Sequence, residues 1–261
     1  MSDSSGPRSV ERAIELIKLV ARAEPKGGRL IDLANQSRLS RATTHRLLSG
    51  LIGEGLIEQA ANGGRYFLGP EATVLARAAR LRIDWAGIAA NSLRRLVGVA
   101  QDVTLLTLRS GSEAVIVERL EGDFPLRTHV AKLGDRHPVG VGAAWIAMLA
   151  EMADAEIKRL LALSTVQRQQ FPGFSSNSVW TLVREARDRG YAVNPGLVFE
   201  GSWGMALPVV LDGGQPVAAV TIAALANRLT PERQATLLPA LRREVDVISE
   251  MARAAHHRSV A

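Results

Sequence analysis

Three segments in the first quarter of the chain repeat apolar residues with the period of an α-helix. The first covers residues 10–23, and a Pro-Lys-Gly-Gly run at residues 25–28 ends it. A shorter apolar pattern follows over residues 30–37. Ser40 then stands where its hydroxyl can cap a third helix, which we expect to run to about Glu54. A short helix, a turn and a second helix of this kind predict a helix-turn-helix.

The third helix has one side suited to the protein core and one side that is free. At 100° per residue, Leu48 and Leu51 fall on the first side, and Thr44 joins them. We therefore expect Thr44 to be buried. The free side and its flanks, which could enter a DNA major groove, carry Ala42, Thr43, His45, Arg46 and Ser49.

Two short extended runs follow the third helix. Residues 56–59 and 65–69 flank a loop at residues 60–64 that contains Asn-Gly, a pattern typical of a β-hairpin. Three helices and a hairpin predict a winged helix-turn-helix domain. Arg65, at the tip of this wing, is placed to touch the DNA backbone beside the groove.

The pattern after the wing predicts a connecting helix. Residues 71–84 are rich in alanine and arginine and contain neither glycine nor proline. The apolar stripe of this helix, with Val74 and Leu81 near its ends, could pack against its own domain or against a second copy of the chain. The sequence leaves both arrangements open.

Helical and extended patterns alternate from residue 85 onward, which predicts an α+β domain whose antiparallel sheet is covered by helices. The expected helices cover residues 88–99, 142–151, 154–163, 178–189 and 231–256. The expected strands cover residues 102–109, 114–120, 126–132, 205–211 and 217–223. The chain therefore divides into a small helical unit with a wing and a larger unit built on a sheet.

Composition excludes several classes of protein. The 261 residues are 47% hydrophobic and 22% charged, which supplies packed cores and excludes a mainly disordered chain. The chain has no cysteine, which excludes disulfide scaffolds, thiol catalysis and cysteine-ligated zinc. The polar first residues lack the apolar stretch of a secretory signal, and no apolar run approaches the roughly 20 residues of a membrane span. We therefore expect a soluble, cytoplasmic protein without a membrane partner.

Positive charge is concentrated near the N-terminus. Residues 1–80 carry 12 Lys and Arg against 8 Asp and Glu, so +4 of the chain's net charge of +6 lies there and +2 in the other 181 residues. This asymmetry favours a polyanionic partner for the N-terminal part and a nearly neutral role for the rest.

Two other kinds of function stay open at this point. The five histidines show neither a His-x-x-x-His nor a His-Glu-x-x-His pattern, and the chain has no Gly-x-Ser-x-Gly elbow or phosphate-binding glycine loop. We therefore expect no catalytic residue, no metal site and no cofactor, and we do not expect an enzyme. The second alternative keeps a sensory C-terminal domain but makes the winged helix a module for protein–protein contacts.

Four segments of the N-terminal part carry a family pattern. They are residues 9–13 (SVERA), 39–48 (LSRATTHRLL), 51–57 (LIGEGLI) and 65–70 (RYFLGP). Together they resemble the winged-helix domain of the isocitrate-lyase-regulator (IclR) family of bacterial transcription factors. The resemblance implies a regulator that binds double-stranded operator DNA as a homodimer or a dimer of dimers. Carried over by position, it implies that Arg41, Ala42, Thr43, His45 and Arg46 face operator DNA, and we expect Ser40 at the helix start and Arg65 in the wing to contact the DNA with them.

The resemblance extends over the C-terminal part of the chain. Residues 134–144, 190–194, 201–209 and 217–223 are similar to segments of the family's effector-binding domain, which is related to the GAF and PAS sensory folds. The resemblance implies a DNA-binding domain at residues 1–70, a linker helix at residues 71–84 and an effector-binding domain at residues 85–261.

A small organic acid is the effector that the resemblance implies. The helix expected from Gly142 is entered through glycines, and the free N–H groups and dipole of such a helix start suit a carboxylate. By the family match, Ala143 and Ala144 would offer backbone donors, Asn194 and Thr221 side-chain hydrogen bonds, and Gly204, Met205 and Ala223 the walls of the pocket.

Four positions depart from the pattern of relatives, some of which bind small keto-acids. Gly204 stands where some of them have a polar residue or cysteine, Ala223 where they have serine, and Asn194 where an acidic residue is common. Trp145 lies on the entry helix, where a small residue is usual, and Trp203 lies beside the expected pocket. We hypothesise an aromatic or otherwise largely apolar carboxylate, whose binding shifts the linker helices of a dimer and changes the spacing of the two recognition helices.

Overall fold

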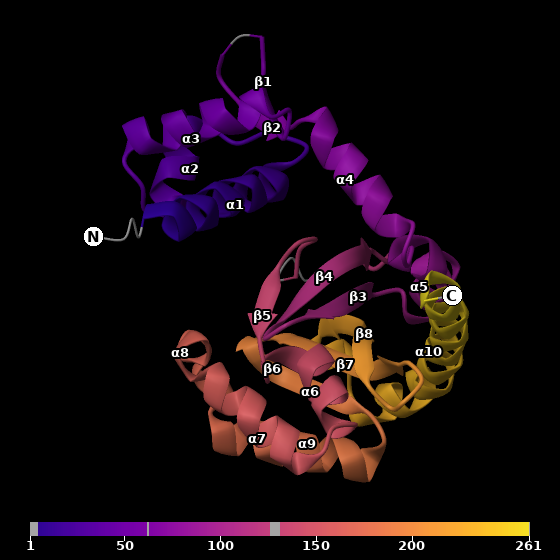
Figure 1. Cartoon of the computed structure of the whole chain (residues 1–261). Coiled ribbons are helices and arrows are strands. Elements are labelled where there is room, and N and C mark those ends of the chain that lie inside the picture. The colour runs from indigo at the N-terminus through magenta and orange to yellow at the C-terminus, as the bar shows by residue number, and fades with distance from the viewer. Residues whose placement is uncertain (1–4, 62, 126–130, 261) are drawn as a thin grey trace. The chain divides into compact units, whose positions relative to one another are not determined.

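A computed structural model describes residues 5–61, 63–125 and 131–260 of the chain. The described chain forms two compact units, the first ending at Arg82 and the second beginning at Ile83 (Figure 1). Among the described helices, none has the length and apolar character needed to cross a membrane. Each unit is taken separately below.

The first unit is a helix-turn-helix with a two-stranded wing and a following helix. Tyr66 in the wing pairs with Gln59 on the neighbouring strand and with Gly28 in the loop after the first helix. This second pairing attaches the wing to the helical part of the unit. The elements are α1 (Ser5–Ala23), α2 (Leu30–Ser37), α3 (Arg41–Gly53), β1 (Ile57–Gln59), β2 (Tyr66–Leu68) and α4 (Pro70–Arg80).

The start of α3 is fixed as the sequence predicts. The Ser40 hydroxyl accepts a hydrogen bond from the Thr43 N–H at 3.2 Å, so Ser40 is the N-cap. Thr44 is fully buried, and its hydroxyl donates to the Ser40 carbonyl at 3.0 Å. Leu48 lies one turn further along the same face and is also fully buried, so this face of α3 packs in the core of the unit.

The connecting helix α4 ends a few residues before the predicted limit. Its first residue is Pro70, whose fixed backbone angle suits the first helical position. All of α4 lies in the described chain, and none of its residues is buried. Val74, Leu75 and Leu81, the last directly after the helix, are more than half exposed, so none of the described residues covers the apolar stripe.

The second unit is a six-stranded antiparallel sheet between two layers of helices (Figure 1). The strand order is β5-β4-β3-β8-β7-β6, and the sheet curls. Helices α5 and α10 cover one face, while α6 and α9 cover the other. The strands are β3 (Val103–Ser110), β4 (Glu113–Leu120), β5 (Arg136–Pro138), β6 (Ala192–Phe199), β7 (Ser202–Val210) and β8 (Pro216–Leu225). The helices are α5 (Trp85–Ala100), α6 (Gly142–Ala150), α7 (Asp154–Leu163), α8 (Thr165–Arg168), α9 (Ser176–Arg189) and α10 (Pro231–Val260), with 3-10 turns at Pro172–Phe174 and Ala226–Arg228.

The α+β fold class is confirmed, but the sequence missed both edge strands. The strand expected over residues 126–132 falls mostly outside the described residues. Strand β5 is only three residues long and ends in Pro138, so it has little of the alternation by which strands are found. Strand β6 contains Pro195 and Gly196, and its pairing with β7 is interrupted after Asn194.

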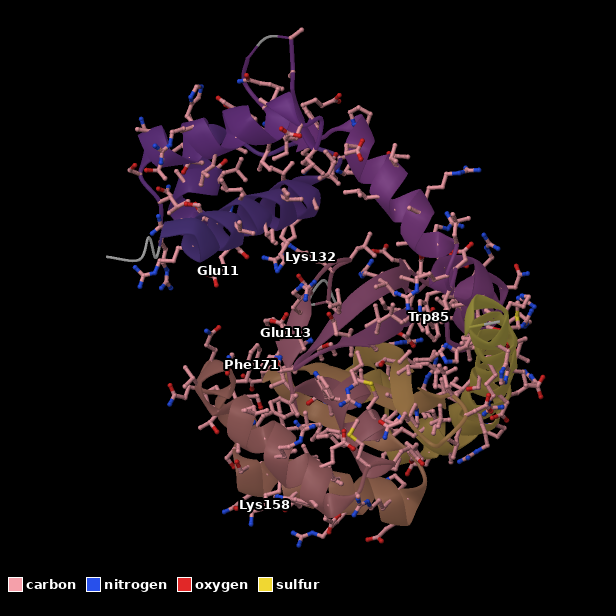
Figure 2. All side chains as sticks on the ribbon, in the orientation of Figure 1. Glu11, Trp85, Glu113, Lys132, Lys158 and Phe171 are labelled. Carbon is pink, nitrogen blue, oxygen red and sulfur yellow. The ribbon has the colours of Figure 1, made fainter. Side chains whose placement is uncertain are left out.

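Alternation along the central strands separates two cores. On β8, Val220 and Ile222 face α5 and α10, while Thr221 and Ala223 face the opposite side. Large side chains therefore fill the first face, and side chains crowd the space between this face and its helices in Figure 2. On the opposite face the small residues of β7 and β8 leave room for a cavity.

Candidate functional site

The N-terminal unit gathers most of the predicted DNA-facing residues on one helix. Arg41, Ala42, His45 and Arg46 are exposed on the first half of α3, and Ser40 is exposed directly before it. The helix thus presents two guanidinium groups and an imidazole on the side opposite its buried face. Thr43 completes the predicted set on α3.

Thr43 is held by the residue that caps its helix. Its hydroxyl lies 2.8 Å from the Ser40 hydroxyl, and Ser40 also accepts from the Thr43 N–H. This pair orders the first turn of α3, whose remaining N–H groups and helix dipole suit a phosphate oxygen. Arg41 on the same turn adds a positive charge.

Arg65 has a different place from the one expected at the tip of the wing. Its Nη1 donates to the Lys26 carbonyl at 3.0 Å and to the Gly27 carbonyl at 2.9 Å. The side chain therefore ties the start of β2 to the loop after α1. The expectation of a place at the tip was wrong, because a long arginine side chain can fold back onto backbone carbonyls that are distant in the chain. No sequence pattern indicates which carbonyls these are. A DNA contact by this residue remains a prediction.

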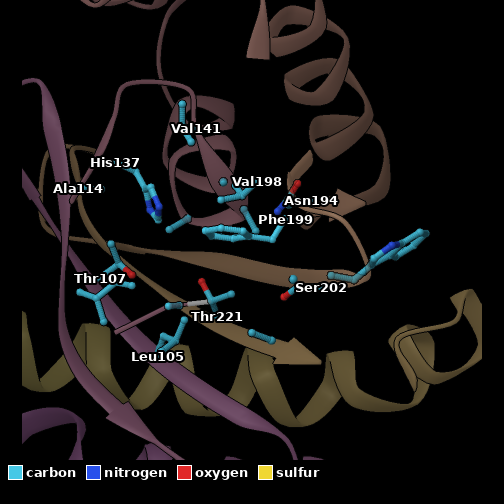
Figure 3. A pocket seen from close by; sticks show the side chains of 18 residues that line it. Leu105, Thr107, Ala114, His137, Val141, Asn194, Val198, Phe199, Ser202 and Thr221 are labelled. Carbon is cyan, nitrogen blue, oxygen red and sulfur yellow. The ribbon is translucent and has the colours of Figure 1, made fainter. Parts of the chain in front are cut away.

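The second unit contains a cavity between the curled sheet and the start of α6 (Figure 3). Its volume is about 70 Å³, several times the roughly 10–15 Å³ that one water molecule needs. Among its described lining residues, none has a permanently charged side chain. The lining comprises Leu105, Thr107, Ala114, Ile116, Ala131, His137, Val141, Gly142, Ala143, Ala144, Asn194, Val198, Phe199, Ser202, Trp203, Gly204, Thr221 and Ala223.

The start of α6 opens onto this cavity. Val141 precedes the helix and offers no side-chain cap, and Gly142 has a φ of +86°, a conformation that favours glycine. The N–H groups of Gly142, Ala143 and Ala144 lie in the first turn and lack helical acceptors. A helix start without a capping side chain leaves these donors for a ligand, with the positive end of the dipole behind them.

Two polar side chains complete this end of the cavity. Thr221 is only 6% exposed, and in the described part of the chain its hydroxyl has no hydrogen-bond partner. A buried hydroxyl without a partner is costly, and functional sites are where such groups persist. Asn194 accepts from the Leu197 N–H at 3.0 Å through Oδ1, which orients its amide nitrogen. Figure 3 shows both residues at the cavity.

Gly204 lies close to Thr221 and to Ala143 in the first turn of α6. A Cβ atom built on Gly204 would lie 3.4 Å from Thr221 Cγ2 and 3.5 Å from Ala143 Cβ. One carbon therefore fits with ordinary contacts, whereas a longer side chain would occupy the cavity itself. The structure brings together six of the seven residues predicted for the pocket, namely Ala143, Ala144, Asn194, Gly204, Thr221 and Ala223.

Met205 is the exception, and its prediction as a pocket wall was wrong. It is fully buried in the core that α5 and α10 form with the other face of the sheet. Neighbouring residues of a strand point to opposite faces, so Gly204 and Met205 cannot both line one cavity. The Trp145 side chain also does not line the cavity. It is fully buried, and its Nε1 donates to the His137 carbonyl at 3.0 Å. Trp203 does line the cavity.

His137, Thr107 and Phe199 are among the lining residues that the sequence analysis did not assign to the pocket. Burial lowers the pKa of the His137 imidazole, and the charge of Asp135 opposes this effect only in part. The imidazole is therefore neutral near pH 7. His137 entered the sequence analysis only through the search for histidine patterns of metal and catalytic sites, and its one local signal was its place on the approach to the glycine-edged helix start.

Two family descriptions match this chain. "Bacterial transcriptional regulator IclR C-terminal" matches residues 79–250, and "IclR helix-turn-helix domain" matches residues 9–61. The chain belongs to the IclR family. It is a DNA-binding transcriptional regulator with a C-terminal ligand-binding domain, not an enzyme. The helix-turn-helix and the expected absence of enzymatic activity are thereby confirmed.

Individual IclR proteins are similar over most of their length. The HTH-type transcriptional repressor AllR of Escherichia coli K12 is 28% identical over 233 residues, which cover 87% of this chain and 84% of AllR. An IclR transcriptional regulator from Alicyclobacillus acidocaldarius has a TM-score of 0.74 at 23% identity, covering 94% of this chain and 98% of the other. An IclR homolog from Microbacterium hydrocarbonoxydans, complexed with 4-hydroxybenzoate, has a TM-score of 0.72 at 19% identity, covering 94% and 99%.

Proposed function

We propose that this IclR-family regulator binds operator DNA through α3 and that a small monocarboxylic acid in the C-terminal cavity controls this binding. The observation that carries the proposal is the uncapped start of α6 beside the unpartnered hydroxyl of Thr221. Together they offer several hydrogen-bond donors at one end of a mostly apolar cavity. A carboxylate is the group that such donors stabilise best.

The lining supports a single negative charge on an otherwise apolar molecule. One carboxylate can bind the first-turn N–H groups of α6, the Asn194 amide and the Thr221 hydroxyl. A second carboxylate would be buried without a cation, since the described lining has no Lys or Arg, and burying an unpaired charge is costly. Leu105, Ile116 and Phe199 favour a ring or another apolar body. The relative complexed with 4-hydroxybenzoate makes hydroxybenzoates natural first probes.

The exposed side of α3 is the proposed DNA contact. Arg41 and Arg46 would bind phosphates or guanine edges, and Thr43 would contact the backbone or a thymine methyl group. His45 and Ala42 lie on the same side and would approach the groove with them. Ser40 adds a hydroxyl at the helix start, where a phosphate oxygen is well placed.

Two copies of the chain would act together. The exposed apolar residues of α4, with no partner in the described chain, favour a homodimer or a dimer of dimers. A dimer presents two α3 helices to half-sites about one helical turn apart. Acid binding would then change operator affinity by shifting the α4 helices and with them the spacing of the two α3 helices.

Calorimetry with a panel of acids tests the effector class. Benzoates and phenylacetates should bind the wild type, and small hydrophilic acids such as glyoxylate or pyruvate should bind at least about 10-fold more weakly because they leave the apolar lining unfilled. Binding confined to the small hydrophilic acids would contradict the proposed apolar body of the effector.

The Thr221→Val variant should move stability and binding in opposite directions. It removes a buried hydroxyl that has no partner in the described chain, so the free energy of unfolding of the empty protein should rise by about 1 kcal/mol. Acid affinity should fall roughly 5- to 10-fold because one donor is lost. Urea unfolding and calorimetry measure the two effects, and Thr221→Ser, which keeps the hydroxyl, is the matched control. Unchanged acid affinity in Thr221→Val would remove Thr221 from the site.

A further inference from the structure

Polar side chains also line the side of the cavity away from Asn194, namely those of His137 and Thr107 (Figure 3). Strands β5 and β6 are the two opposite edges of the sheet, yet His137 from β5 and Asn194 from β6 both line the cavity. The curl of the sheet brings them to opposite sides of one space (Figure 3). Thr107 lies on the His137 side of the cavity, below the imidazole.

An aromatic contact holds the His137 ring, and a hydrogen bond holds its backbone. Phe171, labelled in Figure 2, packs edge-to-face against the imidazole with 5.8 Å between ring centroids and 80° between planes. The backbone of His137 is fixed as well, because its carbonyl accepts from the fully buried Trp145. A ring fixed in this way can distinguish where a ligand carries its polar atoms.

The two ring nitrogens are free to bind a ligand. Among the described residues, none hydrogen-bonds a ring nitrogen of His137, and the residue lines the cavity. Burial holds the pKa of the ring below its usual value, with Asp135 as the charged group that opposes the shift. A neutral imidazole has one N–H donor and one acceptor nitrogen, which is the complement of a hydroxyl.

We propose that His137 is a specificity-determining residue that hydrogen-bonds a hydroxyl group at the far end of the effector. The effector is then a hydroxylated monocarboxylic acid, with its carboxylate at the start of α6 and its hydroxyl at His137. This inference rests on the proposed function, because it takes the carboxylate end as given.

Paired acids that differ by one hydroxyl test the inference. Calorimetry would compare benzoate with 3- and 4-hydroxybenzoate, and phenylacetate with 4-hydroxyphenylacetate, on the wild type. In at least one pair, the hydroxylated acid should bind on the order of 10-fold more tightly, because the analogue without a hydroxyl leaves a buried ring nitrogen unpaired. In His137→Phe this preference should vanish, while the affinity for the unhydroxylated acid stays within about 2-fold.

His137→Gln is the matched control, because its amide keeps one donor and one acceptor and should retain part of the preference. His137→Leu replaces the Phe variant if thermal unfolding shows that the latter does not fold. A wild type that binds acids without preferring the hydroxylated ones would overturn the inference and leave the proposed function intact. A preference that survives in His137→Phe and His137→Leu would overturn it too. A wild type that binds none of the acids would instead refute the carboxylate effector, and this inference with it.

Discussion

The double variant Arg41→Ala/Arg46→Ala should bind operator DNA on the order of 100-fold more weakly than the wild type, with unchanged acid affinity. Both side chains are exposed on the free side of α3. An arginine contact to a phosphate or a guanine edge contributes about 1–3 kcal/mol, and two such contacts should combine to an effect of this size. Fluorescence anisotropy with a labelled fragment of the chain's own upstream DNA measures the operator affinity.

Arg159→Ala is the charge control for this experiment. Arg159 is exposed on α7 in the C-terminal unit, so its replacement removes a positive charge without touching α3. The control should bind DNA like the wild type. In the double variant, the slope of log affinity against log salt should also become shallower, by about 1 for each of the two arginines that contacts a phosphate. Equal DNA affinity in the double variant and the wild type would show that α3 does not read the operator.

The Gly204→Leu variant should lose acid binding by a factor of roughly 100 or more while it keeps its operator affinity. The first carbon of the new side chain fits between Thr221 and Ala143, and the rest must enter the cavity. It would take the place proposed for the carboxylate and cover the first-turn N–H groups of α6. Calorimetry measures the acid affinity, and thermal unfolding checks the fold.

The Gly204→Ala variant distinguishes blocking of the acid site from a general loss of folding. Its Cβ would make ordinary contacts of 3.4 and 3.5 Å, so it should fold normally and bind the acid with an affinity between those of the wild type and the leucine variant. A graded loss from Gly to Ala to Leu is the expected series. Wild-type acid affinity in a folded Gly204→Leu protein would place the acid elsewhere in the molecule.

Local sequence patterns predicted the parts of the fold that depend on interactions between residues close together in the chain. The helix wheel of α3 identified Thr44 as buried, because a polar residue on an apolar face must turn inward with its neighbours. Ser40 was identified as the cap, because its hydroxyl satisfies an N–H three residues ahead in the chain. The start of α6 was predicted for a similar reason, since glycines mark where a backbone can turn into a helix.

The parts that the sequence could not predict depend on contacts between distant segments. His137 lines the cavity only because the sheet curls and brings its β5 edge to the other side of the same space as β6. The face of the sheet on which the Met205 side chain lies follows from the register of the strands. The family resemblance, from which its role as a pocket wall was taken, does not specify that register. Arg65 folds back onto carbonyls 38 and 39 residues away in the chain. Such positions need the three-dimensional arrangement.

Coupling between the two units is the central claim, and one measurement tests it most directly. The operator dissociation constant would be measured by fluorescence anisotropy, with and without a saturating concentration of the tightest-binding acid, for the wild type and Gly204→Leu. We predict that the acid changes the operator affinity of the wild type by at least about 5-fold and leaves that of Gly204→Leu unchanged. An acid that occupies the wild-type cavity without altering operator affinity would contradict the account.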